Sequence, residues 1–126
     1  MKAVLVDTSV WVDHFRSNSA SLVQLLSFDQ VRMHPMVLGE LACGTPPSRA
    51  QTLADLERLQ QMQQAGLREV LIFIEKERLF GLGCGLVDIT LLASTLMTPG
   101  AELWTLDKRL GHLARQFAVA YQPLTH

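Results

Sequence analysis

The sequence predicts an α/β fold: a single domain spanning residues 1–126, with a central parallel sheet of about five strands flanked by helices on both faces. Short apolar runs such as Ala3–Val6 alternate along the chain with longer segments of helical periodicity. Strands that alternate with helices indicate parallel pairing, because a parallel connection requires a crossover. The 126 residues, 48% of them hydrophobic, suffice for one core and are too few for two ordinary domains.

The first half of the chain is expected to hold two strands. Ala3–Val6 is a continuous apolar run with β-branched residues, typical of a strand buried on both faces, and Val31–Met33 is a weaker candidate. Between and after them, capping residues and apolar spacing predict helices. These helices begin near Val10 after a Thr8 or Ser9 cap, and then cover Ser21–Phe28, Met36–Cys43 behind Pro35, and Ser48–Ala65.

The second half is expected to hold three further strands. Leu86–Thr98 is apolar nearly all round, which predicts a buried helix. Asp107 begins a helix whose apolar residues recur at helical spacing. The strands are expected at Arg68–Leu71, Glu102–Leu106 and Ala118–Tyr121, with a charged helix over Phe73–Phe80.

Composition excludes several classes of protein. No apolar run approaches the roughly 18 residues of a membrane span, and Met1-Lys2 leads into no signal-peptide core. Cys43 and Cys84 form neither a disulfide framework nor a zinc pattern, so a cytoplasmic protein is expected. The net charge of −1 offers no argument for a nucleic-acid partner. This net charge does not exclude a nucleic-acid partner. If four of the acids were collected in a metal site, the charged residues outside that site would have a net positive charge.

Two acids directly follow predicted strands. Asp7 comes after Ala3–Val6, and Asp107 comes after Glu102–Leu106. Ligands of parallel α/β folds bind at the carboxyl ends of strands, so both positions favour a site. Each acid is equally suited to cap the following helix, and a capping carboxylate keeps one oxygen free.

Two further acids lie in apolar helices. Glu40 lies among apolar neighbours, where solvent exposure is the simple alternative to a role in a site. Asp88 lies in the most hydrophobic helix of the chain, and no Lys or Arg occurs between Arg78 and Lys108 to pair with it. An ionised carboxylate there needs a cation or a polar cleft. Convergent carboxylates without a thiol or imidazole suit Mg²⁺ or Mn²⁺, which bind phosphoryl oxygens and activate water.

At this point four motifs resemble a known family. The N-terminal segment Asp7-Thr8-Ser9-Val10-Trp11-Val12-Asp13 looks like the opening of the PIN-domain nucleases, and most like the VapC-type toxins of toxin–antitoxin pairs. Glu40, Asp88 and Asp107 match the family's later acids in order and at similar spacing. Thr105 matches a position that often carries a hydroxyl beside the acids. Many members have a further Asp or Asn near the last acid, whereas Leu106 and Lys108 stand here, which leaves the number of metal ions open.

The resemblance implies a specific function. It implies a metal-dependent endoribonuclease, with Asp7, Glu40, Asp88 and Asp107 as ligands of Mg²⁺ or Mn²⁺ and Thr105 as an additional site residue. It implies tRNA or ribosomal RNA as substrate, a cognate VapB-like antitoxin as partner, and a homodimer. The apolar side chains of the second predicted helix also suggest a dimer, since Leu22, Leu25, Leu26 and Phe28 exceed what one face buries.

Two other functions are compatible with the residues. A phosphatase or phosphoacceptor would use Asp7 as nucleophile, although Ser9 stands where the Asp-x-Asp pattern needs its second acid. A non-catalytic PIN-like interaction module would be expected to lack some of the acids, and all four are present. Arg16, Lys108 and Arg109 are candidate phosphate contacts or ordinary surface charges. Gly81, Gly83 and Gly85 lack a nucleotide-binding pattern and predict a flexible turn.

Overall fold

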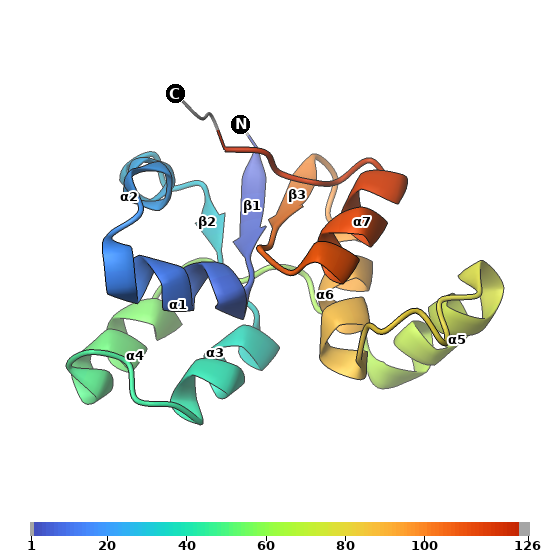
Figure 1. Cartoon of the computed structure of the whole chain (residues 1–126), viewed down its shortest axis with the longest axis horizontal. Coiled ribbons are helices and arrows are strands. Elements are labelled where there is room, and N and C mark those ends of the chain that lie inside the picture. The colour runs from blue at the N-terminus through green and yellow to red at the C-terminus, as the bar shows by residue number, and fades with distance from the viewer. Residues whose placement is uncertain (1, 124–126) are drawn as a thin grey trace.

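A three-stranded parallel sheet organises the molecule. The computed structural model describes residues 2–123. The strands are β1 (Ala3–Val6), β2 (Val31–Arg32) and β3 (Ala101–Trp104), in the order β2-β1-β3. Val4 pairs with Val31 and Glu102, and Val6 pairs with Trp104. The three strands therefore end at one edge of the sheet (Figure 1).

Helices flank this sheet, as Figure 1 shows. The helix over residues 35–42 begins with Pro35 in its first turn, as predicted, and the His34 ring caps it. The seven helices in the described residues are α1 (Thr8–Ser17), α2 (Ala20–Ser27), α3 (Pro35–Ala42), α4 (Arg49–Glu57), α5 (Leu67–Glu77), α6 (Leu86–Leu96) and α7 (Lys108–Gln116). The predicted α/β class with a flanked parallel sheet is confirmed.

The core forms around β1 and α6. Val4, Leu5 and Val6 of β1 are buried, as expected for the central strand of a parallel sheet. Every residue of α6 from Ile89 to Thr95 is buried. The threonine hydroxyls of this helix are satisfied locally: Thr90, for example, donates to the Leu86 carbonyl at 2.7 Å. The buried α6 packs against β3 and fixes the position of its own N-terminus beside the sheet edge.

The strand predicted over Arg68–Leu71 is wrong, because these residues lie in α5. The Glu69 carboxylate accepts a hydrogen bond from the Gly66 N–H at 2.9 Å, which caps the helix at its start. Only Val70 of this helix is buried, whereas Leu71 and Ile72 are more than half exposed. A strand buried on both faces would have enclosed all three side chains.

The long helix predicted over Ser48–Ala65 ends early. The helix α4 stops at Glu57, and the following segment runs parallel to the chain beyond β2. Met33 donates to the Gln60 carbonyl and accepts from the Met62 N–H, both at 2.8 Å. The backbone of Met33 thus draws residues 60–62 out of the helix and into an isolated bridge.

The predicted strand over Ala118–Tyr121 is reduced to one isolated bridge between Leu103 and Ala120. The described residues therefore form a sheet of three strands, where about five were predicted. Within the same residues, no helix combines the length and apolarity that crossing a membrane requires.

Candidate active site

Asp7 is buried at the carboxyl end of β1, with 5% of its surface exposed. It stands at the N-cap position of α1, yet its side chain makes no capping hydrogen bond. Its Oδ2 instead accepts from the Ser9 hydroxyl at 2.8 Å and from the Thr105 hydroxyl at 2.7 Å. Two hydroxyls thus fix one carboxylate oxygen, and Oδ1 has no hydrogen-bond partner among the described residues.

Thr105 connects Asp7 to Asp107. Its Oγ1 donates to Asp7 and accepts from the Asp107 backbone N–H at 3.0 Å. The Asp107 Oδ1 accepts from the Leu110 N–H at 2.9 Å and so caps α7. Ser9 closes the same turn, because its Oγ accepts from the Leu106 N–H at 3.0 Å. The predicted capping role of Asp107 is confirmed, and its Oδ2 forms no hydrogen bond within residues 2–123.

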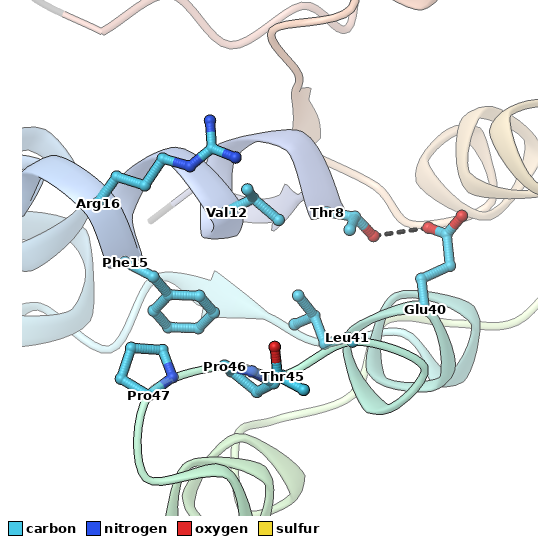
Figure 2. Close-up of a pocket in the computed structure, with 10 residues that line it drawn as sticks. Thr8, Val12, Phe15, Arg16, Glu40, Leu41, Thr45, Pro46 and Pro47 are labelled. Carbon is cyan, nitrogen blue, oxygen red and sulfur yellow. Dashed lines mark hydrogen bonds between the residues drawn. The ribbon is translucent and has the colours of Figure 1, made fainter.

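Glu40 is exposed on α3 and reaches the start of α1. Its Oε1 accepts from the Thr8 hydroxyl at 2.6 Å (Figure 2). Figure 2 shows its second oxygen directed away from that contact. The exposed position agrees with the solvent-facing alternative, while the hydrogen bond directs one oxygen of Glu40 to the residue next to Asp7.

Asp88 lies half-buried in the first turn of α6. Burial raises the pKa of its carboxyl, and the negative charges of Asp7 and then Asp107 raise it further. A backbone hydrogen bond at Gly85 lowers the pKa of Asp88, and the negative charge of Glu40 raises it by a smaller amount. The charges of the other three acids thus add to the effect of burial on Asp88, which places Asp7, Asp107 and Glu40 near it at this edge of the sheet.

A cation borders this edge. The Arg109 side chain lies directly over Gly83, where an added Cβ would come within 2.6 Å of a guanidinium nitrogen. The pKa of the neighbouring Cys84 thiol is raised by burial and then by Asp88 and Asp107, whereas Arg109 lowers it. Arg109 and the loop before α6 are thus close to the acids. Within residues 2–123 no carboxylate lies within ion-pair distance of Arg109.

The donor set is that of a hard cation, although the side chains do not enclose an ion in this conformation. The side chains joined by hydrogen bonds at this edge are carboxylates and hydroxyls, whose oxygens are the ligands that Mg²⁺ and Mn²⁺ prefer. In the part of the chain that the structure describes, no three acidic, histidine or cysteine side chains are grouped closely enough to hold a metal. Glu40 and Asp107 are both exposed, and each carboxylate accepts one hydrogen bond from a described residue.

Two residues of this network were not predicted as site residues. Ser9 ties Asp7 to the turn after β3, and Thr8 holds Glu40. The signal was their position: hydroxyl side chains directly after a buried strand lie at the edge where the acids gather. Their roles depend on partners 32 and 97 positions away, which spacing along the chain does not reveal.

Comparison with known proteins identifies relatives over almost the whole chain. No family model matches it. The chain is 44% identical over 117 residues to "Ribonuclease VapC32" of Mycobacterium tuberculosis, in the strains CDC 1551 / Oshkosh and ATCC 25618 / H37Rv. The match covers 93% of this chain and 94% of each relative. The chain therefore belongs to the VapC-type family of PIN-domain toxins.

Proposed function

We propose that this protein is the toxin of a toxin–antitoxin pair and an endoribonuclease that depends on Mg²⁺ or Mn²⁺. One observation carries the proposal: hydroxyl and backbone hydrogen bonds hold Asp7, Glu40 and Asp107 at the ends of the strands, and burial followed by repulsion from these three acids raises the pKa of Asp88 beside them. Such repulsion costs free energy unless a cation offsets it. The relatives named ribonuclease support the reaction class.

Asp7, Glu40, Asp88 and Asp107 would hold the cation. A divalent ion bound there supplies charge to stabilise the phosphoryl oxygens of RNA and to lower the pKa of water. Each of Asp7, Glu40 and Asp107 has one carboxylate oxygen in a hydrogen bond and the other free of such bonds to described residues. One oxygen of each of these carboxylates is thus held by the protein, and the other is available to bind the cation.

The hydroxyl residues position the acids. Thr105 and Ser9 hold Asp7 at a fixed rotamer, and Thr8 restrains Glu40. Preorganised donors and acceptors of this kind reduce the reorganisation that the reaction requires. Arg109, at the border of the acidic edge, is placed to contact a phosphate of the substrate.

Substrate and partner follow from the family. RNA is the substrate, with tRNA or ribosomal RNA as the class that inhibits translation when cut. A cognate VapB-like antitoxin is the partner that restrains the activity. The phosphoacceptor alternative is not favoured, because Ser9 stands where the Asp-x-Asp pattern needs its second acid, and Ser9 instead donates a hydrogen bond to Asp7.

We also propose a homodimer, formed through the face around α5 rather than through α2. The surplus predicted for this segment reduces to Phe28, which is 59% exposed, because Leu22 and Leu25 are buried in the core and Leu26 is partly buried. Leu67, Leu71 and Ile72 of α5 are instead more than half exposed on one short helix. Such apolar patches mark interaction sites in soluble proteins.

Sedimentation of the wild type and two variants tests the dimer. At tens of micromolar, roughly the concentration at which an interface of standard size stays formed, the wild type should sediment as a dimer. The Ile72→Glu variant should sediment as a monomer at the same concentration. The Val23→Glu variant places the same charge at an exposed position of α2 and should remain a dimer. A monomeric wild type, or equal behaviour of the two variants, would contradict this part of the proposal.

Cleavage of total RNA tests the ribonuclease. Antitoxin-free protein should cut a small set of RNAs with Mg²⁺ or Mn²⁺ and none in chelator. The Asp88→Asn variant should be inactive. Asp13→Asn is the matched control, because Asp13 is an exposed aspartate on α1 outside the acidic edge. Intact RNA with both metals, or equal activity of the two variants, would refute the proposal.

A further inference from the structure

A cavity opens beside the acidic edge. Its volume is about 390 Å³, and it lies between α1 and the segment from α3 to Pro47 (Figure 2). Thr8 and Glu40, which the proposed active site also uses, line one end of it. Pockets for small ligands occupy roughly 300–1,000 Å³, so this one has room for a single nucleotide-sized group. A ligand in the cavity would touch the active site directly.

The walls of the cavity are apolar and rigid. Figure 2 shows the Phe15 ring directed from α1 towards Pro46 and Pro47, with Leu41 beside it. Each proline has a fixed φ angle, which stiffens this loop. Hydrogen bonds from α4 also hold this loop, because the Arg49 side chain donates to the carbonyls of Ala42 at 2.6 Å and Gly44 at 3.2 Å. The cavity is therefore preformed rather than dependent on a loop closing.

The rim of the cavity is polar. Arg16 lines it from α1, and Figure 2 shows its guanidinium on the side of Phe15 away from the prolines. None of the residues described by the structure forms an ion pair with Arg16. Thr45 lines the opposite wall, is exposed, and makes no side-chain hydrogen bond within residues 2–123. A cation and a hydroxyl without protein partners flank an aromatic surface.

We propose that this cavity binds the nucleotide next to the scissile phosphate of the RNA, with its base against Phe15 and its phosphate at Arg16. The inference rests on the proposed ribonuclease function and adds the site that positions the substrate. Single-stranded RNA is recognised by aromatic surfaces that contact bases and by cations that contact phosphates. Phe15, Arg16 and Thr45 supply both kinds of group and a hydroxyl for a base edge.

The arrangement favours RNA over a protein segment as the occupant. A peptide held only by the apolar walls would leave the Arg16 guanidinium without an anion. A nucleotide separates its phosphate from its base by one sugar, and Phe15 and Arg16 both line this cavity. A chain that continues from there reaches Thr8 and Glu40, where cleavage is proposed.

Binding measurements with cleavage switched off test the subsite. All variants are made in the Asp88→Asn background, and a labelled single-stranded oligoribonucleotide of about ten nucleotides is the probe. Arg16→Gln should weaken binding roughly fivefold and reduce the salt dependence by about one phosphate contact. Phe15→Leu should weaken binding roughly fivefold with unchanged salt dependence. Arg115→Gln, an exposed arginine on α7 outside the cavity, should bind as the parent does.

A variant that fills the cavity from an exposed position tests the subsite without disturbing the buried core. Thr45→Trp places a large ring in the cavity from an exposed position, so the chain should fold and lose RNA binding. Melting temperatures of all variants establish that they are folded. RNA affinities equal to that of Arg115→Gln would overturn the subsite. Loss of affinity for the antitoxin with unchanged RNA affinity would overturn it too, because a protein segment would then be the occupant.

Failure of the subsite and failure of the ribonuclease proposal give different results. For cleavage, Arg16→Gln, Phe15→Leu and Thr45→Trp are made in the wild-type background, which keeps Asp88. Cleavage by the wild type, with the same rate and cut sites for these three variants, would remove the subsite and keep the nuclease. Absence of cleavage by the wild type, with the binding losses intact, would remove the nuclease and keep an RNA-binding cavity. Cleavage by the wild type with lower rates or shifted cut sites in the variants supports both.

Discussion

The Thr105 hydroxyl donates a 2.7 Å hydrogen bond to Oδ2 of Asp7 and so joins the ends of β3 and β1. The pairing of Val6 with Trp104 places these two residues side by side, one position past each strand. The sheet register thus sets the position of a buried carboxylate. A substitution of Thr105 that removes its hydroxyl should therefore lower both the stability of the fold and the rate of RNA cleavage.

Thr105→Val removes this hydrogen bond and keeps the shape of the side chain. Because Asp7 is buried, the free energy of unfolding should fall by about 1–2 kcal/mol in urea denaturation. RNA cleavage should fall further than stability explains, since Asp7 loses one of its two restraints. Thr98→Val is the control, because it removes a 3.1 Å bond to a backbone carbonyl at the end of α6. If the two variants had equal activity, Thr105 would have no role in positioning Asp7.

Gly83→Ala should destabilise the loop before α6. Gly83 has a φ of +83°, and its added Cβ would press against the Arg109 side chain. Gly81→Ala is a matched control, because its φ is +71° and nothing lies within 4 Å of the added Cβ. Backbone strain should cost both variants about 1–2 kcal/mol in chemical denaturation. Only Gly83→Ala should also displace Arg109 and lower RNA cleavage, and equal cleavage by both would show that the position of Arg109 is irrelevant.

His34 should make the fold sensitive to acid. Its Nδ1 accepts from the Met36 N–H at 3.0 Å, so its proton is on Nε2, 3.1 Å from the buried Ser94 hydroxyl. Burial lowers the pKa of His34 below its ordinary value of 6.5. The unfolded chain therefore takes up a proton more readily, and stability should fall as the pH drops below about 6.5.

His34→Asn tests this assignment. The amide oxygen can still cap α3, while the group that titrates is gone. The variant should lose about 1–3 kcal/mol at neutral pH, because the Ser94 contact is broken. Its denaturation midpoint should vary less with pH between 7 and 5 than that of the wild type. An unchanged pH profile would show that another group controls acid stability.

The acidic edge was predictable because its signals are local. An acid directly after a buried strand, and Asp88 without a cation nearby in an apolar helix, can be recognised from neighbouring residues alone. The pKa of Asp88 is raised by its burial and then by the charges of the other three acids, as expected for a carboxylate in an apolar helix with no cation nearby. Whether the four acids bind a metal stays a prediction.

The rest depends on contacts between distant residues. The segment Arg68–Leu71 was predicted to be a strand, yet it lies in α5, whose apolar side chains at Leu71 and Ile72 are exposed. Gly83 was predicted to lie in a flexible turn, and the structure gives it a specific neighbour in Arg109. The segment after Glu57 leaves its helix because of the backbone of Met33. No such partner can be inferred from spacing.

Thermal melts of the wild type and Asp88→Asn, in chelator and in excess Mg²⁺, test the central claim most directly. In chelator Asp88→Asn should be at least as stable as the wild type, because the neutral amide avoids both the burial of a charge and the repulsion from Asp7, Asp107 and Glu40 that raise the pKa of Asp88. A roughly hundredfold excess of Mg²⁺ over its dissociation constant should stabilise the wild type by about 2.7 kcal/mol and the variant by less. Equal magnesium-dependent shifts for the two proteins, or no shift for either, would contradict a metal site shared by the four acids.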